Sequence, residues 1–207
     1  MRITAKAREE VRERILSAGK SLFHRKGFAG TTTRDISRAA AIAVGTLFNY
    51  FPNKESLGMS ILAEALERGR SRFLGEDRGI PTLEEALFAH VASELREMRP
   101  HRSFVGPVLE TAMSPFGPSQ VSSEGEKARQ DHLATVAEMI IDRFGLDAAT
   151  SVTLQLYWSL YLGVLAFWSR DDSPHQEDTL AMLDQATRLF VASLSAPARD
   201  DHEGGKR

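Results

Sequence analysis

The chain of 207 residues contains no cysteine. Disulfide bonds, thiolate chemistry and cysteine-ligated zinc sites are therefore excluded. The six histidines are dispersed, and no pair has the i, i+4 spacing with a helical carboxylate that zinc hydrolases use. A nucleophile elbow, a glycine-rich phosphate loop and paired catalytic carboxylates are also missing. We therefore expect no enzyme, no metal site and no cofactor, and a solvated turn explains the cluster of Asp171, Asp172 and His175.

Strand-like alternation and internal repeats are missing as well, whereas apolar residues recur at helical spacing along the chain. The pattern predicts an all-α protein. Its first helix is expected over residues 5–26, with a buried stripe of Val11, Ile15, Ala18, Leu22 and Phe23. Residues 1–14 are charged and lack an apolar stretch of the kind found in secretory signals, so we expect a cytoplasmic location.

The longest run without formal charge, residues 148–169, holds 22 residues and is long enough for a membrane-spanning helix. Its first half is crowded with Thr150, Ser151, Thr153, Gln155 and Ser159, and neither flank has an excess of Lys or Arg. We therefore expect no membrane segment. A helix that is apolar on nearly all sides must instead be covered by protein on more than one side, and a second copy of the chain could supply part of that cover.

Charge is divided unevenly between the two parts of the chain. Residues 1–57 contain 11 Lys and Arg and 5 Asp and Glu, a net charge of +6, whereas residues 58–207 contain 15 and 23, a net charge of −8. This division is expected when one end of a protein contacts phosphate groups and the other does not. A basic surface that contacts only solvent would explain the net charge of +6 in residues 1–57, but not the net charge of −8 in the rest of the chain.

Residues 32–54 have the pattern of two short helices joined by a tight turn, followed by the start of a third helix. Thr32 and Asp35 form a capping-box pair that predicts the start of the first short helix. Residues 44–51 would form a second helix about 12 Å long, which fits the major groove of B-DNA. Asn53 is expected to cap the next helix. A helical hairpin inside a bundle is the alternative, but the segregated charge favours DNA binding.

Thr33, Ile36, Ser37 and Ile42, followed by the run from Gly45 to Leu57 (GTLFNYFPNKESL), resemble the N-terminal domain of the TetR family of transcriptional regulators. The resemblance is dense over residues 14–57 and extends to the rest of the chain in length and helical pattern. It implies a helix-turn-helix DNA-binding domain in residues 1–57 and a helical ligand-binding and dimerisation domain in residues 58–196. The composition of residues 197–207 predicts a disordered tail.

Three positions depart from the family pattern. Ala41 stands where the family often has glycine, Ala43 where it often has a serine that caps the recognition helix, and Phe48 where it usually has tyrosine. The missing serine removes a cap that contributes about 1 kcal/mol. The missing tyrosine hydroxyl removes one phosphate contact.

DNA contacts in the head follow from side-chain chemistry and from the family pattern. Guanidinium, hydroxyl and amide groups can contact base edges or phosphates, and in the family the positions of Thr33, Tyr50 and Lys54 usually hold phosphates. The predicted contacts are Thr33, Arg34, Val44, Gly45, Thr46, Asn49, Tyr50 and Lys54.

Further helices are expected in the second part of the chain. Thr82 and Glu85 form a capping-box pair before a helix that Pro100 ends. Helices are also predicted over residues 104–113 and 120–145, and the last helix is predicted to start at Ser173-Pro174, with Gln176 completing a capping box.

In the TetR family the last two helices of each subunit form an intermolecular four-helix bundle, which implies a homodimer here through residues 152–168 and 180–194. A dimer with two heads would read a palindromic operator in double-stranded DNA. The side chains expected at the dimer interface are Leu154, Tyr161, Leu165, Trp168, Leu183, Thr187, Phe190 and Leu194.

The family resemblance also implies a pocket for a small-molecule effector in the second domain. The candidate lining residues are Met98, Phe104, Val108, Glu110, Met113, Phe116, Tyr157, Trp158 and Tyr161. Core packing is the alternative for all the apolar members, because Met and aromatic residues at helical spacing usually form a core.

These features predict a homodimeric repressor that a small, largely apolar ligand releases from a palindromic operator. The alternative is a helical dimer that carries a ligand or binds proteins and whose head has lost its affinity for DNA. Ala43 and Phe48 are the residues that keep this second interpretation open.

Overall fold

The computed structural model describes residues 4–76, 79–112 and 123–194. Within these ranges every regular element is helical and no strand occurs, which confirms the predicted fold class. The α-helices are α1 (Ala5–Lys26), α2 (Thr33–Ala39), α3 (Val44–Phe48), α4 (Lys54–Glu76), α5 (Leu83–Met98), α6 (Arg102–Ala112), α7 (Ser123–Glu138), α8 (Ser151–Trp168) and α9 (Glu177–Leu194). Short 3₁₀ turns lie at Arg99–His101 and Pro174–Gln176, and a π-helical turn at Met139–Arg143.

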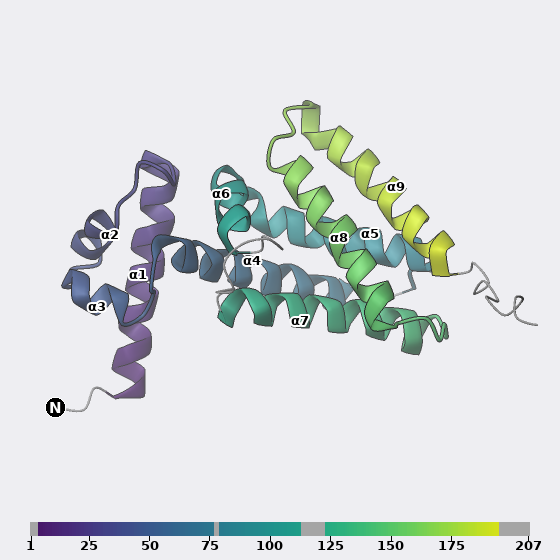
Figure 1. Ribbon diagram of the computed structural model, residues 1–207, viewed down its shortest axis with the longest axis horizontal. Coiled ribbons are helices and arrows are strands. Elements are labelled where there is room, and N and C mark those ends of the chain that lie inside the picture. Colours follow the sequence, from purple (N-terminus) through teal and green to yellow (C-terminus); the bar gives the residue numbers. More distant parts are fainter. Residues whose placement is uncertain (1–3, 77–78, 113–122, 195–207) are drawn as a thin grey trace, which may run out of the picture.

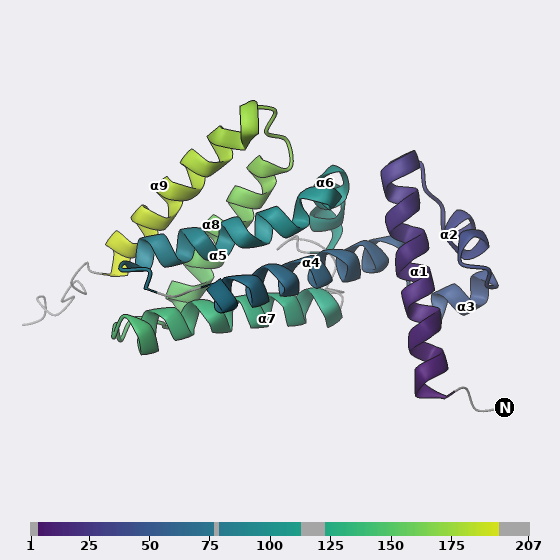
Figure 2. The same ribbon diagram turned by 180° about the vertical axis from the view of Figure 1, so that it is seen from behind.

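The molecule has a small head and a larger body (Figure 1). Helices α1, α2 and α3 form the head, and α4 runs from the head along the body beside α5 and α7 (Figures 1 and 2). Helix α4 has 23 residues, so it is about 35 Å long. It crosses the predicted domain boundary after residue 57 without interruption.

Side-chain caps explain where several helices begin. Thr32 accepts a hydrogen bond from the backbone N–H of Asp35, and the Asp35 carboxylate accepts one from the N–H of Thr32, so the predicted capping box is present. Asn53 caps α4, because its Oδ1 accepts a 2.6 Å hydrogen bond from the N–H of Ser56. Thr82 caps α5 through the N–H of Glu85. These polar residues satisfy N–H groups that the first helical turn leaves without partners.

The recognition helix and the last helix differ in extent from the prediction. The recognition helix has five residues, Val44–Phe48, rather than extending to Phe51, because Asn49 and Tyr50 turn by i to i+3 hydrogen bonds. The last helix begins at Glu177 rather than Ser173. Gln176 has a φ of 61° and does not complete a capping box; Asp171 Oδ2 instead accepts from the N–H of Thr179 at 3.0 Å. Asp171 is therefore buried and structural, unlike the predicted solvated turn.

Close helix crossings fix the head on the body. A Cβ atom on Gly58 of α4 would lie 2.6 Å from Val108 Cγ2 and 3.2 Å from Phe28 Cε2, so only glycine fits between the head and α6. The rings of Phe23 and Phe104 meet at the same junction, with centroids 5.1 Å apart. Lys20 and Glu64 form an ion pair of 2.8 Å between α1 and α4. The head and the start of the body therefore share one apolar core.

Helices α8 and α9 form an antiparallel hairpin on the body, and the turn between them lies beside α6, where Arg102 donates a hydrogen bond to the carbonyl oxygen of Trp168 (Figure 1). One face of the hairpin packs on α5 and on the rest of the core, and the other remains exposed. Among the described residues, no helix combines the length and the apolar character that a membrane-spanning segment requires.

Candidate DNA interface and ligand cleft

Three buried apolar side chains anchor the two short helices of the head. Ile36, Leu47 and Phe51 lie in the core with at most 2% exposure. Their spacing turns the opposite faces of α2 and α3 outward. All eight predicted DNA contacts then lie at the surface or partly so: Arg34, Gly45 and Asn49 are exposed, and Thr33, Val44, Thr46, Tyr50 and Lys54 are half-buried.

The turn between α2 and α3 contains a residue in an unfavourable conformation. Ala41 has a φ of 54°, in the left-handed region that glycine adopts most easily. The chain reverses there through hydrogen bonds from Ala41 N–H to Arg38 O and from Ile42 N–H to Ser37 O. Ala43 then precedes α3 with an extended backbone and provides no side-chain cap. The two alanine departures thus fall on the turn and on the start of the recognition helix.

Lys54 has a structural contact as well as its predicted contact with DNA. Its Nζ donates a 2.8 Å hydrogen bond to the carbonyl oxygen of Phe28 and lies 4.4 Å from the centre of the Phe28 ring. These contacts place the ammonium group at the first turn of α4, where free N–H groups favour an anion. Because an ammonium group has three donors, it can bond to Phe28 and to a phosphate together.

The residues predicted at the dimer interface lie mostly inside the protomer. Tyr161, Leu165, Trp168, Leu183, Thr187 and Phe190 are buried in its own core, while Leu154 and Leu194 are half-buried. The apolar side chains exposed on the hairpin are different ones from the same two helices. They are Val152, Leu156, Phe167, Leu180, Met182 and Leu189.

The residues predicted to line a ligand pocket do not form one common cavity. Met98, Phe104 and Val108 are buried in the core near the head. Glu110 is exposed, with an ion pair of 3.6 Å to Arg170. Met113 and Phe116 lie outside the described residues. Tyr157, Trp158 and Tyr161 are buried between α7 and α9, around a different group of side chains described below.

A cleft of about 440 Å³ opens instead between α1, α4 and α7. Charged residues of both signs surround it, and Ala63, Leu66 and Ala128 contribute apolar wall. The basic ones are Arg12, Arg68, Arg70 and Lys127, and the acidic ones are Glu64, Glu67, Glu94, Glu124 and Asp131. Glu94 and His132 also line it. These two side chains are almost fully buried, so they lie at its inner end.

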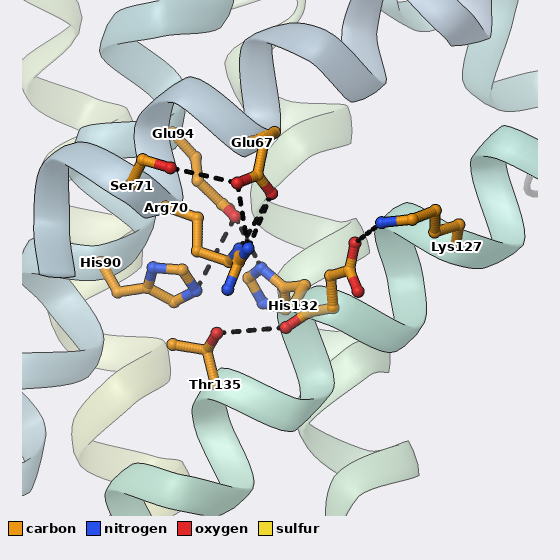
Figure 3. Close-up of polar contacts among 9 residues, drawn as sticks. Glu67, Arg70, Ser71, His90, Glu94, Lys127, His132 and Thr135 are labelled. Carbon is orange, nitrogen blue, oxygen red and sulfur yellow. Dashed lines mark hydrogen bonds and ion pairs between the residues drawn. The ribbon is translucent and has the colours of Figure 1, made fainter.

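A polar cluster lies at this inner end, and Figure 3 shows three of its members, His90, Glu94 and His132. His132 Nδ1 lies 2.8 Å from Glu94 Oε1, and His90 Nε2 lies 3.7 Å from the same oxygen. Tyr161 donates a 2.9 Å hydrogen bond to Glu94 Oε2, and the Tyr157 hydroxyl lies 3.2 Å from His132 Nε2. Helix α5 supplies His90 and Glu94, α7 supplies His132, and α8 supplies both tyrosines. We call these five residues the buried polar cluster.

The protonation states in the buried polar cluster follow from its surroundings. Burial opposes the charged form of Glu94, but the nearby positive charge of His132 and His90 outweighs it and holds the pKa of Glu94 below its ordinary value. Burial raises the pKa of Tyr157 and Tyr161 well above the ordinary value, and the charge of Glu94 raises both further. The carboxylate is therefore ionised, and both tyrosines keep their protons.

Sequence reasoning missed His90, Glu94 and His132 as a group. The available signal was that all three occupy core-facing positions of their helices: His90 and Glu94 are one turn apart and flank the buried Val91 on α5, and His132 adjoins the buried Leu133. Polar residues in a buried stripe need partners. A search for pairs of histidines one turn apart on a helix does not find this site. Here the residue one turn from His90 is a carboxylate, Glu94, and the second histidine, His132, comes from another helix.

The fold and the head define a helix-turn-helix DNA-binding protein with a helical body. Residues 15–58 match the model of the bacterial regulatory proteins of the tetR family, and residues 87–200 match the tetracyclin repressor-like C-terminal domain. The chain belongs to the TetR family of transcriptional regulators. This membership confirms the family resemblance and the prediction of a non-enzymatic regulator.

Related regulators match over most of the chain. The HTH-type transcriptional regulator UidR of Escherichia coli K12 is 27% identical over 195 residues, which cover 90% of this chain and 93% of UidR. The uncharacterized regulator YvkB of Bacillus subtilis is 28% identical over 190 residues, which cover 89% of this chain and 97% of YvkB. The fold matches Thermus thermophilus FadR in complex with lauroyl-CoA, with a TM-score of 0.68, 22% identity, and coverage of 94% of this chain and 100% of that one.

Proposed function

We propose that the protein is a homodimeric transcriptional repressor in the cytoplasm, and that an amphipathic small molecule in the body cleft releases it from a palindromic operator. The observation that carries the DNA-binding part is the outward presentation of Arg34, Thr46 and Asn49 by α2 and α3, next to the basic N-terminal part of the chain. Hydroxyl, amide and guanidinium groups at the surface of two short helices suit contacts with base edges and phosphates.

The exposed face of the α8–α9 hairpin supports a dimer. Val152 is 76% exposed and Leu189 is 61% exposed. Val152, Leu156 and Phe167 lie about one and about three helical turns apart on α8, so they share one helical face. A second copy of the same face would cover these apolar side chains about a two-fold axis. The predicted helices are retained in this proposal, but the interface uses this exposed face rather than the buried residues predicted from the sequence.

The chemistry of the cleft supports an amphipathic effector. Its apolar wall can cover an acyl or similar chain. The basic side chains at its surface, Arg68, Arg70 and Lys127, are paired with Glu97, Glu67 and Asp131, and they can hold an anionic group of a ligand by exchanging these carboxylates for it. T. thermophilus FadR has been solved with lauroyl-CoA, and B. subtilis FadR with stearoyl-CoA. We therefore propose an effector that carries an anionic group on an apolar chain, of which an acyl-CoA is the first candidate.

The test begins by selecting bound duplexes from a random pool and measuring affinity for the selected sequence by fluorescence anisotropy. We expect a palindrome, binding that weakens steeply with salt, and a salt slope that Arg34→Ala reduces by about one. Arg96→Ala, which removes an exposed arginine from α5, serves as the matched control and should leave the affinity and the salt slope unchanged. If no duplex binds above the salt-insensitive background, the alternative of a carrier or protein-binding dimer replaces this proposal.

The effector is tested on the same complex. Lauroyl-CoA and stearoyl-CoA are added to the protein bound to its selected duplex, with coenzyme A and laurate as separate controls. We expect an acyl-CoA to raise the thermal midpoint of the free protein and to lower its affinity for DNA. If neither acyl-CoA has an effect beyond that of the controls, this effector class is excluded while the DNA-binding result stands.

A further inference from the structure

The buried polar cluster brings together three side chains that bind metal ions. The candidate ligand atoms of His90, Glu94 and His132 all lie within 4.8 Å of one another, and all three residues are buried. Tetrahedral zinc, with bonds of about 2.0–2.2 Å to nitrogen and oxygen, places its ligand atoms about 3.3 Å apart. The distances of 2.8 Å from His132 Nδ1 and 3.7 Å from His90 Nε2 to Glu94 Oε1 lie on either side of that value.

We propose that this cluster is a binding site for a divalent transition-metal ion, held by His90 Nε2, Glu94 Oε1 and His132 Nδ1. Two imidazoles and one carboxylate suit Zn²⁺, and also Co²⁺ and Ni²⁺, whereas Mg²⁺ and Ca²⁺ prefer sites made of oxygen atoms. Adjustments of about 1 Å in the side chains bring the three atoms to bonding distance. The nearly parallel rings of His90 and His132, with centroids 4.7 Å apart and an interplanar angle of 26°, already lie side by side.

Two tyrosines orient the proposed ligands from outside. Tyr161 donates to Glu94 Oε2, which leaves Oε1 directed at the histidines. The Tyr157 hydroxyl lies beside His132 Nε2 and can accept a hydrogen bond from the Nε2–H group, which leaves the Nδ1 lone pair for the metal. Histidine and carboxylate ligands in metal sites commonly have such partners, because the partner fixes the ring orientation and the tautomer. The cluster thus has an outer layer of hydrogen bonds as well as three ligands.

Charge balance also fits a metal ion. An ionised carboxylate in the interior needs a positive partner. A protonated histidine would give a simple buried ion pair, and a divalent ion would supply the charge while both imidazoles stay neutral. A second imidazole on the same oxygen is not needed for an ion pair, but it is needed for a metal site with three ligands.

The site has a path to solvent. Glu94 and His132 line the cleft, so a metal ion and a fourth ligand can reach the site from there. Water or an electron-rich group of a small molecule can serve as that fourth ligand. Binding of the metal by itself does not depend on the proposed DNA binding or on the proposed effector, and it can be measured without either.

The experiment uses the untagged full chain, stripped with a chelator and dialysed against Zn²⁺ or Co²⁺. We expect about one zinc ion per chain to remain after desalting, and the Co²⁺ form to show intense visible absorption typical of four-coordinate cobalt. Zn²⁺ should also raise the thermal midpoint. Failure to retain Zn²⁺ or Co²⁺ would show that the cluster is a buried ion pair and overturn the proposal.

Variants locate the site. His90→Gln, Glu94→Gln and His132→Gln should each reduce metal affinity at least tenfold, and His175→Gln, which alters an exposed histidine, should not. Metal retained at full affinity by all three cluster variants would place the ion elsewhere and overturn the assignment.

A measurement on the unmodified protein covers the case in which these variants do not fold. The imidazole nitrogen resonances are recorded during titration with Zn²⁺. We expect the signals of two of the six histidines to change with one equivalent of metal, and assignment of those signals to residues other than His90 and His132 would contradict the site.

Discussion

Ala41 occupies a backbone conformation that costs a residue with a Cβ atom about 1–2 kcal/mol. Ala41→Gly removes this cost at a φ of 54°, although it also gives the unfolded chain more freedom. We expect the free energy of unfolding to rise by about 0.5–1 kcal/mol in urea denaturation. Ala134→Gly is the matched control: it lies at an exposed position inside α7, where the same exchange should lower the free energy of unfolding by about 1 kcal/mol. Equal effects at the two positions would contradict the assignment of strain to the turn.

Ala43 is the other alanine whose replacement has a clear expected direction. Its extended backbone, with φ −70° and ψ 148°, is that of a cap residue, but it has no acceptor for the free N–H groups of α3. Ala43→Ser should add about 1 kcal/mol of stability and raise the thermal midpoint by roughly 2–4 °C. Ala29→Ser, in an exposed loop, is the control and should change the midpoint little. A serine at position 43 that leaves the midpoint unchanged would show that α3 gains nothing from a cap.

Predictions from single residues succeeded where a local interaction decides the structure. The capping box of Thr32 and Asp35 and the cap at Asn53 depend on residues three positions apart, so their spacing in sequence was sufficient. The buried polar cluster could not be predicted in this way. Glu94 and His132 are 38 positions apart and meet only because α5 and α7 both pack in the body.

Among whole helices, α8 shows what a sequence pattern leaves undecided. Its apolar composition predicts a helix covered on more than one side, whereas within the protomer one face is buried and the other is exposed. Because residues on all sides are apolar, the pattern could not separate the face toward the protomer from the face toward a partner. Tyr161 and Leu165 are on the first face, and Val152 and Leu156 on the second. The boundary of α9 was missed for a different reason, because the buried Asp171 replaced the expected local cap.

The α8–α9 hairpin gives a prediction about assembly. Leu189→Glu places a charge on the proposed dimer face, at a side chain that is 61% exposed in the protomer. Burying that charge in a dimer without a partner is costly, so we expect the variant to sediment as a monomer at concentrations where the original chain is a dimer, with its helical content unchanged. Leu74→Glu, at a 50% exposed leucine on α4, is the control and should remain dimeric. A dimer that tolerates Leu189→Glu would exclude this face.

The stability of the whole molecule should depend on pH through the junction of head and body. His101 is buried there beside the ring of His24, with ring centroids 5.5 Å apart, and its Nδ1 has no hydrogen-bond partner among the described residues. Burial, followed by the positive charge of His24, lowers the pKa of His101 from 6.5 to about 4. The unfolded chain therefore binds a proton at a higher pH than the folded chain does.

The direction of the effect follows from this difference. The contribution of His101 is fully present above pH 6.5 and is lost as the pH falls toward 4, and it amounts to about 1–3 kcal/mol. Urea denaturation at several pH values should show the free energy of unfolding decreasing over this window, and His101→Gln should flatten the decrease. His175→Gln, at an exposed position, should not. A slope that His101→Gln leaves unchanged would assign the acid sensitivity to other groups.

Helix α4 sets how far the two ends of the molecule can move relative to each other. It approaches α5 closely at Gly69, where a Cβ atom would lie only 2.6 Å from the Cα atom of Glu94. From this crossing to Lys54 the helix extends about 22 Å. If the crossing serves as a pivot, a tilt of about 5° there displaces the head by about 2 Å. In a two-fold assembly the separation of the two recognition helices then changes by up to twice that distance, so a sub-ångström rearrangement beside Glu94 becomes a mismatch with the spacing of successive major grooves.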